Sequence, residues 1–161
     1  MTNSTRLQPF EVAQQFIKIN FPTCQAAILA GSVVRGEATE TSDLDIVIFD
    51  KDLKSSYRES LIQFEWKIEL FAHNLTSYKY YFKKDVEEAR PCMPRMVNEG
   101  IIIKNSGVLK VIKAEAKNLL DAGPKEWSID TINIKRYFIS DVLDDLIGSK
   151  IGRNQFLLPI N

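Results

Sequence analysis

The sequence predicts an α/β (α+β) fold, in which helices pack on a sheet of about four or five strands. Short apolar segments bounded by polar turns alternate with longer segments whose apolar residues repeat at helical spacing. The segment 44–49 is apolar on both faces beyond its second residue, as expected for a central strand covered on two sides. The 161 residues, 45% hydrophobic and 26% charged, suit one globular core of ordinary size.

The first helix is expected over residues 8–20, with Pro9 in its first turn. Four apolar residues of this segment repeat at helical spacing: Phe10, Ala13, Phe16 and Ile17. Residues 21–23, which include a proline, end the helix. The first strand then runs from about residue 24 to residue 29.

The segment 31–49 carries the chemistry of the chain. After the first strand, Gly31-Ser32 opens an expected short helix over 32–35, an exposed turn over 37–42 and a second strand over 44–49. Asp43 and Asp45 lie one residue apart, so both carboxylates point to the same side. Such a pair repels itself unless a divalent cation lies between the two groups, and magnesium prefers these oxygen ligands. The Gly-Ser turn offers backbone N–H groups and a hydroxyl to an anion such as phosphate, which indicates phosphoryl or nucleotidyl transfer.

Residues 57–63 and 66–73 predict two strands of a hairpin that turns at Phe64-Glu65. In the second strand, Glu69 shares one face with Lys67, Phe71 and His73. Two interpretations of Glu69 stay open here. It is either a functional acid beside the Asp pair or a solvent-facing residue paired with Lys67, since strand alternation alone does not say which face is buried. Asp50, at the far end of the second strand, is a weaker rival.

The second half of the chain predicts three longer helices and one short strand. A helix starts at Asn74 or Thr76 and runs to about residue 89, followed by a short helical segment after Pro91 and Pro94. A brief strand over 101–104 precedes a helix over 107–120, which Gly123 and the next proline close. A last amphipathic helix spans 128–147. We expect a core domain over 1–127 and a C-terminal helix and tail over 128–161.

Composition limits the functional classes. Lysine plus arginine equals aspartate plus glutamate, so the net charge is zero, which disfavours sequence-independent binding of nucleic acid. Cys24 and Cys92 have neither metal-ligand spacing nor a disulfide framework. Residues 1–6 lack the apolar core of a signal peptide, and no apolar run reaches membrane-spanning length. We therefore expect a cytoplasmic protein without membrane partners.

The Gly31-Ser32 pair and the triplet Asp43-Leu44-Asp45, followed by Ile46-Val47-Ile48, resemble the signature of the DNA polymerase beta-type nucleotidyltransferase superfamily. The pattern Gly-Ser-x-x-Arg-Gly-Glu-Ala-Thr-x-x-Ser-Asp-x-Asp is similar to its small bacterial members, the minimal and antibiotic nucleotidyltransferases. The resemblance implies a nucleotidyltransferase fold with a mixed, twisted sheet.

The resemblance also implies roles for particular residues. Asp43, Asp45 and Glu69 would be the catalytic acids and would hold two Mg²⁺ ions around a nucleoside triphosphate. Nucleotide binding would fall to Gly31, Ser32 and Arg35. For Arg35 the alternative is a surface pair with a glutamate at position 37 or 40. The implied reaction moves a nucleoside monophosphate, AMP from ATP, onto a hydroxyl of a small molecule or protein.

A second functional class stays open, a non-catalytic nucleotidyltransferase-fold module of the partner-binding or antitoxin-like kind. The intact trio of acids favours an enzyme, because unpaired buried charges are costly without a metal. The module is favoured because only one or two helices follow the core, where antibiotic-modifying relatives carry a helical acceptor domain. Either the chain is a truncated form or a second subunit, as in a homodimer, completes the acceptor site. The lone His73 and the aromatic cluster 78–82 are expected to serve packing first.

Overall fold

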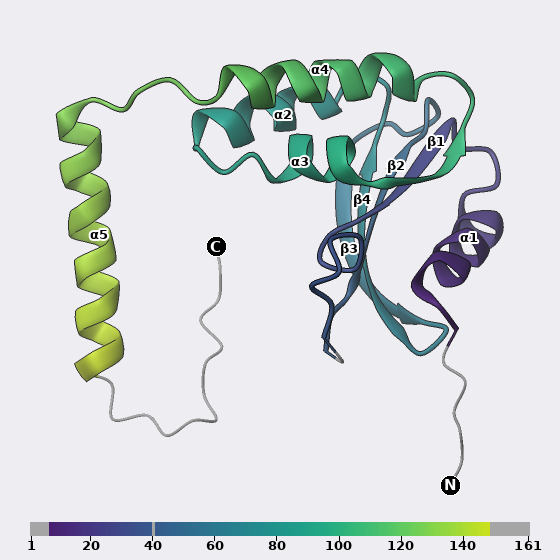
Figure 1. Cartoon of the computed structure of the whole chain (residues 1–161), viewed down its shortest axis with the longest axis horizontal. Helices are drawn as coiled ribbons and strands as arrows, with labels where there is room; N and C mark the ends of the chain where they lie inside the picture. Colours follow the sequence, from purple (N-terminus) through teal and green to yellow (C-terminus); the bar gives the residue numbers. More distant parts are fainter. Residues whose placement is uncertain (1–6, 40, 149–161) are drawn as a thin grey trace, which may run out of the picture. The chain divides into compact units, whose positions relative to one another are not determined.

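The computed structural model describes residues 7–39 and 41–148 (Figure 1). Its sheet has five strands in the order β3-β4-β2-β1-β5. Strand β2 pairs in parallel with β4, whereas the β1–β2, β1–β5 and β3–β4 pairs are antiparallel. The predicted mixed sheet is therefore confirmed. The strands are β1 (Ala26–Ala30), β2 (Leu44–Phe49), β3 (Tyr57–Gln63), β4 (Trp66–His73) and β5 (Ile101–Asn105).

The helices form two groups along the chain. The first compact unit, Met1–Pro124, holds the sheet and four helices, and the second, Lys125–Asn161, holds α5. This division falls close to the expected boundary between residues 127 and 128. The helices are α1 (Pro9–Asn20), α2 (Tyr78–Glu87), α3 (Cys92–Glu99), α4 (Leu109–Ala122) and α5 (Ile129–Gly148).

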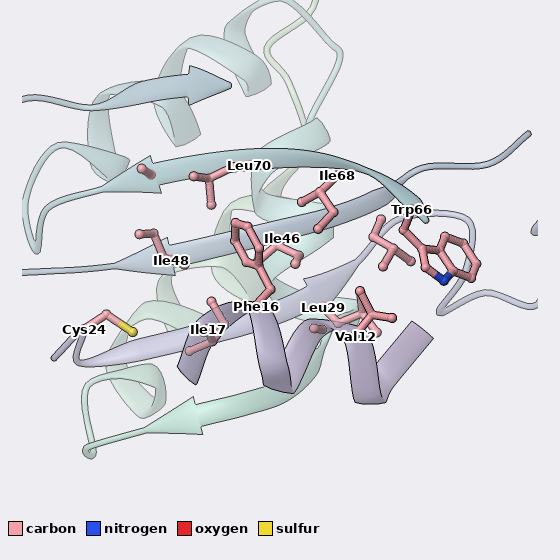
Figure 2. Close-up of a cluster of buried hydrophobic side chains, with 14 residues drawn as sticks. Val12, Phe16, Ile17, Cys24, Leu29, Ile46, Ile48, Trp66, Ile68 and Leu70 are labelled. Carbon is pink, nitrogen blue, oxygen red and sulfur yellow. The ribbon is translucent and has the colours of Figure 1, made fainter. Parts of the chain in front are cut away.

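Helix α1 covers one face of the sheet (Figure 1). Its apolar stripe points at the even-numbered side chains of β2 and β4, because side chains alternate between the two faces of a strand. Figure 2 shows this cluster, in which Phe16 lies among side chains from three strands. The buried residues of this layer include Val12, Phe16, Ile17, Leu29, Ile46, Ile48, Ile68 and Leu70.

Helices α2, α3 and α4 cover the opposite face, which carries the odd-numbered side chains of β2 (Figure 1). Strand β2 is buried on both faces except at Asp45, which is half-buried. The prediction of a central strand is confirmed, and Asp45 is the polar exception within it. The buried residues of this second layer include Ala26, Ile28, Val47, Phe49, Tyr78, Phe82, Met93, Val97, Leu109 and Ile112.

Two predicted elements differ in the structure. Residues 32–36 form a hydrogen-bonded turn and not the expected short helix. The N–H of Val34 donates to the carbonyl of Gly31 at 3.3 Å and that of Glu37 to the carbonyl of Ser32 at 3.0 Å, and Gly36 (φ +72°) ends the segment after this single turn. The helix expected from Asn74 or Thr76 begins at Tyr78 instead. Oδ1 of Asn74 accepts the N–H groups of Thr76 and Ser77 at 3.0 and 2.8 Å, which makes a separate turn before the helix.

The second unit contains the predicted last helix. Oγ of Ser128 accepts the N–H of Thr131 at 3.2 Å, so its side chain caps the start of this helix. The apolar tail of the sequence, residues 149–161, lies outside the described residues. In the described part of the chain, none of the helices has the length and apolar character needed to cross a membrane.

Candidate active site

The bend after β1 lies directly against the second aspartate of the motif. Strand β1 ends at Ala30, which is paired with Asp45 in the antiparallel register of β1 and β2. The next residue, Gly31, has φ +79°, and a Cβ built on it would overlap Oδ2 of Asp45. Glycine is therefore favoured at this position by its backbone conformation, and a larger residue would force the Asp45 carboxylate to move.

Asp45 and Glu69 are neighbours across the parallel β2–β4 pair, in direct register. Both side chains point to the face that α2, α3 and α4 cover, so the functional interpretation of Glu69 agrees with its placement. Burial first, and then the negative charges of Asp43 and Glu69, raise the pKa of the Asp45 carboxyl to about 6. Both of the other acids predicted from the sequence are thus close enough to repel the Asp45 carboxylate.

Glu69 is buried and held by two residues of the neighbouring strand β3. Ser60 donates its hydroxyl to Oε1 at 2.7 Å, and Arg58 donates Nε to Oε2 at 2.9 Å and also pairs through Nη2. The Ser60 hydrogen bond first, and then Arg58, lower the pKa of Glu69, so the side chain is ionised. Glu69 is therefore not the solvent-facing residue of the alternative interpretation, although Lys67 does lie 3.9 Å from Oε1.

Asp43 precedes β2 and is held by the ammonium group of Lys67, 3.1 Å from Oδ2. The hydrogen bond and charge of Asp43 raise the pKa of Lys67. The sequence pattern indicated Lys67 only as a partner of Glu69, and it did not indicate the contacts of Arg58 and Ser60. The signal was present in the two-residue hairpin turn at 64–65, which fixes the register and places Ser60 opposite Glu69.

The predicted phosphate-binding residues lie in the turn after Gly31. Ser32 donates its hydroxyl to Oγ of Ser42 at 3.4 Å, and Ser42 also accepts the N–H of Thr39 at 2.8 Å. Arg35 pairs with Glu37 at 2.9 Å between Nε and Oε2, which is the surface pair that the sequence left open. A role for Ser32 or Arg35 toward phosphate stays a prediction.

A cavity of about 540 Å³ adjoins Asp45 on the side of β3 and β4. His73 lies in its wall, where burial lowers the pKa of the imidazole to about 4 and Nδ1 lies 3.0 Å from Oγ of Ser56. Asp50 is not in this wall. It lies just past the far end of β2, where its Oδ1 accepts the N–H of Asp52 at 3.0 Å. The lining residues include Asp45, Arg58, Phe71, His73, Tyr81 and Arg90.

The donor set of this site suits a hard divalent cation, since all three acids offer carboxylate oxygens beside a close glycine bend. Within residues 7–39 and 41–148, however, no three acidic, histidine or cysteine side chains are placed to hold one ion together. Oxygens of Asp43 and Glu69 are instead engaged by Lys67, Arg58 and Ser60. The residues therefore fit a metal by their chemistry, and ion binding requires side chains to rearrange.

Comparison with known proteins identifies the family of this chain. The model of the nucleotidyltransferase domain family matches residues 14–147, which include the whole sheet and the candidate site. One solved structure, a nucleotidyltransferase-like protein from Exiguobacterium sibiricum, is similar with a TM-score of 0.49 and 14% sequence identity. The match covers 68% of this chain and 38% of that one. No curated protein matches the chain. Because the family model matches most of the sequence, the chain belongs to the nucleotidyltransferase domain family.

Proposed function

We propose that the protein is a magnesium-dependent nucleotidyltransferase that moves a nucleoside monophosphate, AMP from ATP, onto a hydroxyl of a small molecule or protein. The observation that carries this proposal is the direct register of Asp45 and Glu69 on parallel strands, with Asp43 beside them and the Gly31 bend against Asp45. A cluster of mutually repelling carboxylates is costly unless a cation neutralises it. We infer that the cluster bears this electrostatic repulsion because it binds a metal ion.

In this proposal Asp43, Asp45 and Glu69 are the catalytic residues and hold Mg²⁺. When bound, the metal would polarise the α-phosphate and neutralise charge on the leaving pyrophosphate. The Gly31 and Ser32 turn would donate hydrogen bonds to the β- and γ-phosphates. Arg35 would exchange its pairing with Glu37 for a phosphate oxygen, to which its planar guanidinium is well suited.

The cavity beside Asp45 is our candidate site for the acceptor. In-line transfer places the attacking hydroxyl opposite the leaving pyrophosphate. The glycine bend lies on the β1 side of Asp45, and the cavity that Asp45 also lines is bounded by side chains of β3, β4, α2 and α3. Its volume of about 540 Å³ lies within the range of pockets that bind small molecules. Phe71 and Tyr81 offer aromatic surface, and Arg58 and Arg90 offer charge.

Calorimetry with Mg·ATP tests the nucleotide half of the proposal. The unmutated chain should bind Mg·ATP, and the double variant Asp43→Ala, Asp45→Ala should not. Asp121→Ala is the matched control, because Asp121 also pairs with a lysine but lies on α4 away from the three acids. A pyrophosphate-release assay with each nucleoside triphosphate, against aminoglycosides, lincosamides and candidate proteins, then identifies the acceptor.

The non-catalytic module is the second candidate, and one observation favours it. Lys67 and Arg58 already neutralise Asp43 and Glu69, so the cluster tolerates its charges without a metal. If the unmutated chain binds neither Mg²⁺ nor Mg·ATP, this interpretation replaces the enzyme. We retain the cytoplasm as the expected location, and the two free cysteines are compatible with it. Sedimentation analysis tests the proposed homodimer.

A further inference from the structure

Lys67 lies between two of the three acids on a side chain that is more than half exposed. Its Nζ is 3.1 Å from Oδ2 of Asp43 and 3.9 Å from Oε1 of Glu69, and 55% of the side chain is exposed. It projects from the start of β4, two residues before Glu69 and therefore on the same face. The ammonium thus occupies the space in front of the carboxylates, where an incoming cation must pass.

Arg58 and Lys67 hold the acids in different ways. Arg58 donates two N–H groups to one oxygen of Glu69, lies 4.8 Å from the Phe71 ring centroid, and acts together with Ser60 from a strand in fixed register. Lys67 has a flexible four-carbon stem and a compact charge with rotatable donors. Of the two cations, Lys67 has fewer contacts to give up when it leaves its carboxylates, because Arg58 makes two hydrogen bonds to Glu69 and also stacks on Phe71.

A divalent ion and the Lys67 ammonium compete for the same oxygen. A metal bound at the Asp43 carboxylate would lie within a few ångströms of the ammonium that donates to Oδ2, and two cations at that separation repel each other. The displaced ammonium then needs a new negative partner. A metal-bound nucleoside triphosphate would bring oxyanions to the mouth of this site, and lysine binds phosphate well as a point charge.

We propose that Lys67 is the internal counter-ion of the metal-free site and becomes a phosphate ligand when metal and nucleoside triphosphate bind. This inference rests on the proposed function. The ammonium leaves Oδ2 of Asp43 and donates to a non-bridging phosphate oxygen, so that one side chain first restrains the acids and then stabilises charge during transfer. Lys67 is in that case a catalytic residue that touches the substrate.

The two roles predict opposite effects of one substitution. Lys67→Met keeps the apolar stem but removes the charge, so Mn²⁺ without nucleotide should bind roughly 3- to 10-fold more tightly. Mg·ATP should bind about 10-fold more weakly to the same variant, because a phosphate contact is lost. A residue that only maintained the local structure would weaken both ligands together.

The experiment measures Mn²⁺ binding by electron paramagnetic resonance and Mg·ATP binding by calorimetry, on the full chain. The variants are Lys67→Met, Lys67→Arg and the control Lys117→Met, whose lysine pairs with Asp121 at 2.7 Å on α4. The inference expects the crossed effect in Lys67→Met, recovery of both affinities in Lys67→Arg, and no change in the control. Thermal unfolding of each variant verifies that it is folded.

Two results separate the inference from the function on which it rests. If the unmutated chain binds Mg·ATP but Lys67→Met leaves Mn²⁺ affinity unchanged or weaker, the inference is overturned and the transferase proposal stands. If the unmutated chain binds no Mg·ATP, the transferase proposal and the phosphate role both fail. An unchanged Mg·ATP affinity in a variant that binds Mn²⁺ more tightly would also remove the phosphate role.

Discussion

At the scale of single residues, the site depends on how closely the Gly31 backbone approaches the Asp45 carboxylate. Both Gly31 and Gly36 have positive φ, but only Gly31 has a neighbour that a Cβ would strike, since nothing lies within 4 Å of a Cβ built on Gly36. The two glycines therefore separate the cost of backbone strain from the cost of crowding the carboxylate.

We expect Gly31→Ala to lower the free energy of unfolding by about 2 to 4 kcal/mol, and Gly36→Ala by about 1 kcal/mol. Urea unfolding measures both. In an Asp45→Ala background the cost of Gly31→Ala should fall toward that of Gly36→Ala, because the clashing oxygen is gone. Equal costs for the two glycines in the unmutated background would contradict this account.

Asp45 and His73 respond to pH in opposite directions. The pKa of Asp45 is raised from 3.8 to about 6, so its stabilising contribution is complete below pH 3.8 and is lost as the pH rises through 6. The pKa of His73 is lowered from 6.5 to about 4, so its contribution is complete above pH 6.5 and is lost as the pH falls toward 4. Between pH 4 and 6 the two effects oppose each other.

We expect Asp45→Asn to remove one of these effects. The variant should be more stable than the unmutated chain at pH 7.5 by about 1 to 2 kcal/mol, a value reduced for solvent screening of a half-buried group. This advantage should vanish near pH 4, and between pH 4 and 6.5 the stability of the variant should rise more steeply. Urea midpoints across this range measure it, with Asp121→Asn as control. If the urea midpoints of the variant and the unmutated chain changed with pH in parallel, the prediction would be wrong.

At the scale of elements, the β3–β4 hairpin fixes which side chains surround Glu69. Its two turn residues, Phe64 (φ 54°) and Glu65 (φ 62°), both have positive φ, which matches a type I′ turn. Phe64 also packs against the first core cluster, so only Glu65 is free to be replaced without loss of packing. Glutamate is poorly suited to this backbone conformation.

Glu65→Gly should therefore raise the free energy of unfolding by about 0.5 to 1 kcal/mol, although glycine usually weakens a structure. The control is Glu59→Gly, in the middle of the exposed strand β3, which should lower it by a similar amount. Thermal and urea unfolding compare the two variants. A loss of stability in Glu65→Gly would show that the glutamate has a contact stronger than the strain it carries.

Most helices and strands could be predicted because the pattern that indicates each element lies within its own residues. The alternation in β4 placed Lys67 and Glu69 on one face, and the doubly apolar β2 indicated a central strand. The helix predicted over 32–35 was wrong because the segment between Gly31 and Gly36 holds only a single hydrogen-bonded turn. The cavity and the engagement of Arg35 by Glu37 depend on packing and rotamers, which sequence spacing does not determine.

At the scale of the whole chain, the core and the candidate site lie in one of the two units. The buried residues of both hydrophobic clusters fall between Val12 and Ala116, and the proposed site residues fall between Gly31 and Glu69. All of them precede Pro124, where the first unit ends. Since burial of apolar surface is the main source of stability, the unit Met1–Pro124 should fold without the segment that follows it.

We expect a chain cut after Pro124 to unfold cooperatively, with a midpoint within about 3 °C of the full chain, because it loses no residue of either cluster. Its Mg·ATP affinity should match that of the full chain, since the proposed ligands all remain. A chain cut after Ser106 is the control, because it removes α4 and with it Leu109, Ile112 and Ala116 from the second layer, and it should not fold. Calorimetric scanning measures both. A non-cooperative transition in the longer fragment would mean that α5 contributes to the core, and retained folding with lost Mg·ATP binding would place part of the nucleotide site beyond residue 124.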